Sequence, residues 1–202
     1  MRRFFVLLVT LGFLAGACGG GDEASDEASG TTSSSTTTSS STTTTTLPPF
    51  DPARPDTVLA PVGGYQYVDL PPALFTQLNT EIRSGLPRDY KDAVKGVAAK
   101  SLTKDGQGVG VAMALGFDPK VSALPGFQAG VAEGFKDSGS RSEPLTVGSE
   151  QATLTTDPDK TVAVAWVKGS LVLAVFGQDR PTVQTIATTI IEANKSLTFP
   201  AA

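Results

Sequence analysis

From about residue 65 onward, the chain is a series of short apolar segments separated by turn residues. Period-two alternation or a short apolar run bounded by Gly, Pro, Asn or Asp is typical of a β-strand. This pattern predicts strands at 65–70, 94–103, 109–117, one or two within 142–156, and strands at 161–167 and 171–177. Asp105-Gly106 lies between the second and third of these segments and predicts a tight β-hairpin.

The last two predicted strands differ from the others because they are apolar on both faces. Residues 161–167 read TVAVAWV and residues 171–177 read LVLAVFG, with Lys168-Gly169-Ser170 between them. Strands with two apolar faces are usually buried on both sides. We therefore expect this pair at the centre of the sheet.

Helical spacing of apolar residues occurs in three places. A helix is expected to start near Pro71-Pro72, and another near 125–137, where Phe127, Val131 and Phe135 are four residues apart. In this second helix Gly126, Gly130 and Gly134 share the same spacing, which lowers helix propensity and suggests close approach to the sheet. The third helix has the clearest stripe, and Pro181 fits its first turn. The stripes of the first and third helices consist of Leu74, Phe75, Leu78 and Ile82, and of Val183, Ile186, Ala187, Ile190 and Ile191.

These elements predict an α+β fold with a single antiparallel sheet of about six strands and about three helices, in one domain over 50–202. The segment before it is of another kind, because residues 31–46 are sixteen consecutive Ser or Thr residues. Such a stretch has no apolar face to bury, so nothing offsets the entropy of ordering it. We expect residues 18–49 to be a disordered Ser/Thr-rich linker.

Composition narrows the chemistry. The 202-residue chain has no His, a single Cys at position 18 and a formal net charge of -4. These features exclude His-based triads, His-ligated zinc, disulfides and a thiol nucleophile in the domain, and they do not favour nucleic acid as a partner. We expect no enzyme activity, no cofactor and no metal site.

The chain begins with the pattern of an export signal. Arg2 and Arg3 precede the uncharged apolar segment 4–14, small residues occupy 15–17, and Cys18 follows. The apolar segment is too short to span a membrane. The two arginines are consistent with a plain positive region or with twin-arginine export.

This N-terminal pattern resembles that of bacterial cell-envelope lipoproteins, in which small residues precede the cysteine. The resemblance covers about the first 20 residues, and Ala15 stands where Leu is commonest. It implies cleavage after residue 17, a lipid on Cys18, and a protein tethered to the extracytoplasmic face of the cell membrane. The alternative is an ordinary secreted protein with a chance cysteine.

The later half of the domain, a hairpin with one Trp followed by a helix, resembles the closing unit of several exported bacterial domains. Among these are lipoproteins with a PsbP/Mog1-like fold and the outer domains of anti-sigma-type regulators. The opening YVDLPPALF, residues 67–75, is also similar to these domains, because a strand there runs directly into Pro71-Pro72. The resemblance carries no site residue with it.

Four short motifs invite a chemical interpretation, and each has a plainer one. Residues 101–104 fit S-x-x-K, but they fall in a predicted strand instead of at a helix start. Residues 106–110 are glycine-rich without the G-x-G-x-x-G spacing. Asp157 and Asp159 fit a turn better than a calcium loop, and 194–196 is a glycosylation sequon at a helix end.

Trp166 is the remaining candidate site residue, as a platform for a ligand, although core packing is the default interpretation. The leading functional hypothesis is a lipid-anchored, non-enzymatic module that binds an unknown envelope protein or cell-wall component. The alternative is a carrier that holds an apolar small molecule or lipid in a cavity between the sheet and the helices.

Overall fold

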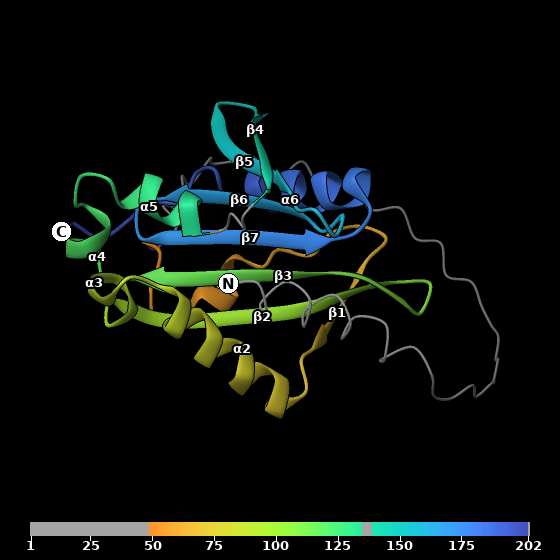
Figure 1. Ribbon diagram of the computed structural model, residues 1–202, viewed down its shortest axis with the longest axis horizontal. Helices are drawn as coiled ribbons and strands as arrows, with labels where there is room; N and C mark the ends of the chain where they lie inside the picture. The colour runs from red at the N-terminus through yellow and green to blue at the C-terminus, as the bar shows by residue number, and fades with distance from the viewer. Residues whose placement is uncertain (1–48, 135–138, 202) are drawn as a thin grey trace, which may run out of the picture.

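A computed structural model describes residues 49–134 and 139–201, which form one seven-stranded antiparallel sheet with helices on both faces (Figure 1). The predicted signal segment, the linker and Cys18 lie outside the described residues. The α+β fold class and the single antiparallel sheet are confirmed, with seven strands because 142–156 forms two. The strands are β1 (Gln66–Asp69), β2 (Val94–Lys104), β3 (Gln107–Phe117), β4 (Arg141–Val147), β5 (Glu150–Thr156), β6 (Val162–Lys168) and β7 (Leu171–Gly177).

The strands follow the order β1-β2-β3-β7-β6-β5-β4 across the sheet. β7 is the central strand, and every one of its residues is buried. β6 lies directly beside it, so the expected central position of this pair is confirmed. The short strand β1 and the strand β4 form the two edges.

The β2–β3 hairpin turns at the predicted Asp-Gly pair. Asp105 has φ 51° and Gly106 has φ 75°, so both central residues are left-handed. This conformation matches the twist of the two strands, and Asp-Gly adopts it readily. The local sequence therefore determines the register of the longest strand pair.

The three predicted helices are present, together with short helical turns. The expected apolar stripe of α2 lies on its inward side, with Leu78 and Ile82 buried. α5 begins at Phe127, after Gly126, which has φ 86°; Phe135 lies outside the described residues. The helices are η2 (Pro55–Val58), α2 (Pro72–Gly85), α3 (Arg88–Lys91), α4 (Pro119–Ser122), α5 (Phe127–Gly134) and α6 (Arg180–Asn194).

One face of the sheet, here called the α6 face, is covered by α6 over β6 and β7. Asp179 caps the helix, because its Oδ2 accepts a hydrogen bond of 3.0 Å from the backbone N–H of Thr182. The five predicted stripe residues of α6 are all 0% exposed. Full burial of such a stripe is the main driving force for packing a helix on a sheet.

The segment 50–62, which precedes β1 and includes η2, covers the α6 face over β2 and β3. Gly96 and Gly116 face each other across these strands, and a Cβ at Gly116 would lie 1.9 Å from the carbonyl oxygen of Pro52. Only glycine allows this close approach. The same segment contacts the C-terminal tail, because Phe50 donates a backbone hydrogen bond of 2.8 Å to Thr198.

The opposite face, here called the α5 face, is covered by α2 at the β2 end and by α5 over β6. The Phe127 ring packs edge-on against Phe117 at 5.1 Å and against Tyr90 at 5.5 Å. Gly130 approaches the Tyr90 ring, which a Cβ would meet at 3.2 Å, and a Cβ at Gly134 would meet nothing within 4 Å. The expectation that this glycine stripe approaches the sheet is therefore wrong.

Candidate functional site

The α5 face carries an open groove of about 460 Å³ beside α5. α5 contacts β6, and the groove lies beside α5 over the part of the sheet that β4, β5 and β6 form. Strands β4, β5 and β6 contribute the floor and α5 contributes one wall. The lining residues are Gln128, Ala129, Ser142, Glu143, Pro144, Gln151, Ala152, Thr153, Ala165 and Val167.

Strand alternation places polar side chains of β5 in the groove. Ala152 and Leu154 belong to the core on the α6 face, so Gln151 and Thr153 point the other way. Thr153 is directly opposite Pro144 on one side and Ala165 on the other. The floor is therefore a mixture of hydroxyl and amide groups with small apolar side chains.

Side-chain hydrogen bonds join β4 to β5 on the groove side. The hydroxyls of Ser142 and Thr155 are 3.1 Å apart, and Gln151 Nε2 donates to Thr146 Oγ1 at 3.2 Å. Within the described part of the chain, the side chains of Gln128 and Thr153 make no hydrogen bond. These two groups can therefore bind a ligand without breaking an internal contact.

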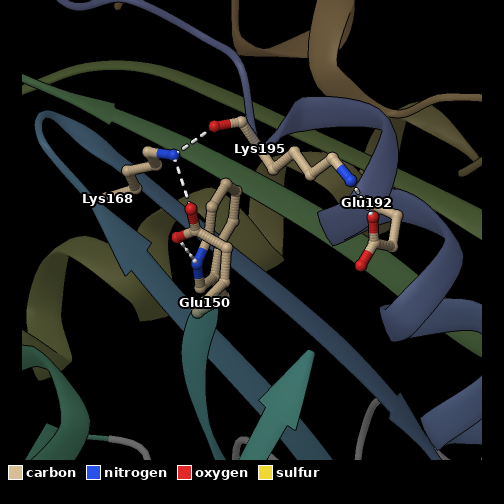
Figure 2. A network of polar contacts seen from close by, with 5 residues as sticks. Glu150, Lys168, Glu192 and Lys195 are labelled. Carbon is tan, nitrogen blue, oxygen red and sulfur yellow. Dashed lines mark hydrogen bonds and ion pairs between the residues drawn. The ribbon is translucent and has the colours of Figure 1, made fainter. Parts of the chain in front are cut away.

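A network of polar side chains lies on the α6 face, where β5 and β6 approach the end of α6 (Figure 2). Lys168 Nζ donates to Glu150 Oε1 at 2.7 Å and also to the backbone carbonyl of Lys195, just past the end of α6. Trp166 Nε1 donates to Glu150 Oε2 at 3.2 Å. Both Glu150 oxygens are thus used, and the network joins β5 and β6 to the end of α6.

The network is mostly shielded from water. The side chains of Lys168 and Glu150 are 25% and 18% exposed. The hydrogen bond from Lys168, followed by that from Trp166, holds the pKa of Glu150 below its usual value against the opposing effect of burial. The cationic Lys168 and the anionic Glu150 are therefore paired with each other in this network.

Trp166, the candidate ligand platform, is in the core of the α6 face and is 1% exposed. It shares this face with Val162 and Val164, as strand alternation predicts. The ring has no face open to a ligand in this structure. Core packing, the default interpretation from the sequence, describes its position.

The other short motifs of the sequence lie in a strand, in two turns and at the buried end of a helix. Residues 101–104 are in β2, and 106–110 form the hairpin turn and the start of β3. Asp159 accepts a hydrogen bond of 2.9 Å from the backbone N–H of Thr161 within a turn. Asn194, the sequon residue, is buried, and its amide donates to the carbonyls of Val58 and Ile190 at 2.8 Å each.

Within 49–134 and 139–201, no group of three or more His, Cys, Asp or Glu side chains could hold a metal ion. In that part of the chain no helix has both the length and the apolar character needed to cross a bilayer.

Comparison with known proteins gives no relative: no family model, no curated protein and no solved structure matches this chain.

The sequence reasoning missed both the groove and the Glu150 network. The groove joins α5 to strands β4 to β6, and local periodicity does not show which helix lies beside which strand. A partial signal was present, because Gln151, Thr153 and Thr155 alternate with apolar residues and so predict a polar strip on one face of β5. Glu150 and Lys168 are 18 residues apart, and their pairing depends on the β5–β6 register.

Proposed function

We propose that this chain is a lipid-anchored, extracytoplasmic binding module of the cell envelope, and that it binds its ligand in the α5-face groove without catalysing a reaction. The observation that carries the proposal is the groove of about 460 Å³. This volume is within the range of ordinary small-ligand sites. The Cys18 pattern and the Ser/Thr-rich segment 31–46 support a tether that gives the domain reach.

The packing of the domain favours this function over a carrier of apolar molecules. A carrier needs space between the sheet and a helix, and the layer under α6 is occupied by side chains that are almost fully buried, such as Trp166 and Ile190. The groove is instead open to solvent and has polar side chains beside its apolar ones.

Replacing Cys18 with Ser tests the anchor. The variant should lose all incorporation of a labelled fatty acid and should accumulate as unprocessed precursor, because lipidation needs the thiol. Metabolic labelling of cells that express each form, followed by immunoprecipitation, measures this. Label that persists on Cys18→Ser would rule out the proposed anchor, and label lost from Ser25→Ala as well would show that the effect is not specific to the thiol.

Binding by the groove is tested with the processed, unlipidated chain, residues 18–202 with Cys18→Ser. Separate lipid, glycan and protein fractions of an envelope are titrated against it, and amide chemical shifts are recorded. The proposal expects one fraction to shift signals of α5, β4 and β5 while those of β1 stay unchanged. Shifts confined to the layer under α6 with the lipid fraction would favour the carrier, and chemical conversion of the component would show an enzyme.

A further inference from the structure

We propose that the α5-face groove binds an uncharged, hydroxyl-rich ligand, a short saccharide. This inference rests on the proposed function and names its ligand class. Four properties of the groove support it: its charge, its unused hydrogen-bonding groups, the pairing of the backbone beneath it and its small apolar side chains.

The groove presents no unpaired charge among its described lining residues. Glu143 is the one charged member of that lining, and it forms an ion pair with Arg180 at the start of α6. Glu143 also stands opposite Leu154, a core residue of the α6 face, so its side chain is directed away from the groove. A charged ligand would find no unpaired counter-charge among these residues.

Uncharged hydrogen-bonding groups come from two sides of the groove. Gln128 on α5 offers an amide, and Thr153 on β5 offers a hydroxyl, both without an internal hydrogen-bond partner in the described chain. An amide and a hydroxyl each both donate and accept, and so does every sugar hydroxyl. Ser142 and Gln151 add further groups of the same kind along the floor.

The backbone beneath the groove is already used, which favours a saccharide over a peptide. From Ala152 to Thr156, β5 pairs with β4 on one side and with β6 on the other, so the backbone groups of this stretch are used in the sheet. An extended peptide binds mainly by adding a strand to an open edge. The nearest edge is β4, where Pro144 lacks an N–H group and blocks regular pairing.

Small apolar side chains complete the fit to a sugar ring. Ala165 and Val167 on β6 and Pro144 on β4 lie among the polar lining residues. A saccharide has C–H faces as well as hydroxyls, so it can contact both kinds of group at once. A purely apolar ligand would leave the Gln128 and Thr153 groups unpaired.

The test titrates the processed, unlipidated chain with a trimer of N-acetylglucosamine, which is uncharged and carries hydroxyl and amide groups. Calorimetry gives the affinity, and amide chemical shifts give the location. The double variant Gln128→Leu with Thr153→Val keeps side-chain size and removes the two hydrogen-bonding groups. It should weaken binding about tenfold or more, as expected for two lost hydrogen bonds.

The matched control is Gln184→Leu with Thr185→Val on α6, at the opposite face of the sheet, where binding should be unchanged. A circular dichroism melt confirms that both double variants fold. Absence of saturable binding by the uncharged trimer, or equal weakening in both double variants, would overturn the saccharide proposal. If a short neutral peptide or another envelope fraction then shifts the groove signals, the binding-module function stands and only the ligand class is wrong. Failure of every probe would remove both.

Discussion

The two faces of the sheet are covered in different ways. On the α6 face, a 15-residue helix with a continuous aliphatic stripe and the segment 50–62 pack on the sheet and bury a large core. On the α5 face, an eight-residue helix with three nearby glycines leaves hydroxyl and amide groups of β5 open. Both faces carry a buried core, and the α5 face differs because it also keeps an open groove beside α5.

The largest expected effect on the free energy of unfolding concerns Trp166 on the α6 face. Trp166→Ala should destabilise the domain by about 3–5 kcal/mol, because it removes the largest buried side chain of that core. The change also removes the hydrogen bond to Glu150. Chemical denaturation of the processed, unlipidated chain measures the shift.

Thr153→Ala is the matched change on the α5 face. It should alter the free energy of unfolding by less than about 1 kcal/mol, because Thr153 is half-buried and makes no internal side-chain hydrogen bond in the described chain. A similar cost at both positions would mean that the two faces are equally packed. A cost below about 1 kcal/mol for Trp166→Ala would reopen its role as a ligand platform.

The next effect concerns the Glu150 network that closes the end of the α6 face. Glu150→Gln should destabilise the domain by about 1–3 kcal/mol at pH 7, because it weakens charge-assisted hydrogen bonds in a largely buried position. The matched change Glu192→Gln breaks an exposed ion pair with Lys195 and should cost clearly less.

The contribution of Glu150 should also depend on pH. Its pKa is lower in the folded protein than in the unfolded chain, so the stabilisation is fully present above the unfolded value of about 4.3. It is lost as the pH falls through the folded value. Urea titrations at pH 7 and at pH below 4 should therefore show the difference between wild type and Glu150→Gln shrinking in acid. A difference that stays constant would mean that the ion pair contributes nothing.

The parts of the fold that the sequence predicts are those with a strong local pattern. Elements with a strong local pattern were predicted well: Asp105-Gly106 set the hairpin, and the five-residue stripe of α6 identified its buried side. Both features depend on residues close in sequence. The central place of β6 and β7 is predicted by another local feature, the two apolar faces of each strand.

The groove on the α5 face and the surroundings of α5 are less predictable, because they depend on contacts between segments that are distant in sequence. The glycine spacing at 126, 130 and 134 suggested one shared role, yet the three positions have different surroundings. Gly126 has a left-handed backbone, Gly130 lies against Tyr90, and Gly134 has open space beside it. Spacing indicated a helix face but could not show what packs against it.

The smallest expected effect concerns the difference between Gly126, directly before α5, and Gly134 within it. Gly134→Ala should stabilise the domain by up to about 1 kcal/mol, because a methyl group there meets no atom within 4 Å and alanine is the better helix former. Gly126→Ala should instead destabilise it, because a φ of 86° is strained for any residue with a Cβ. Thermal melts of the two variants should therefore shift in opposite directions. A stabilising Gly126→Ala would mean that the turn before α5 adopts another conformation, and the wall of the groove would then be placed differently as well.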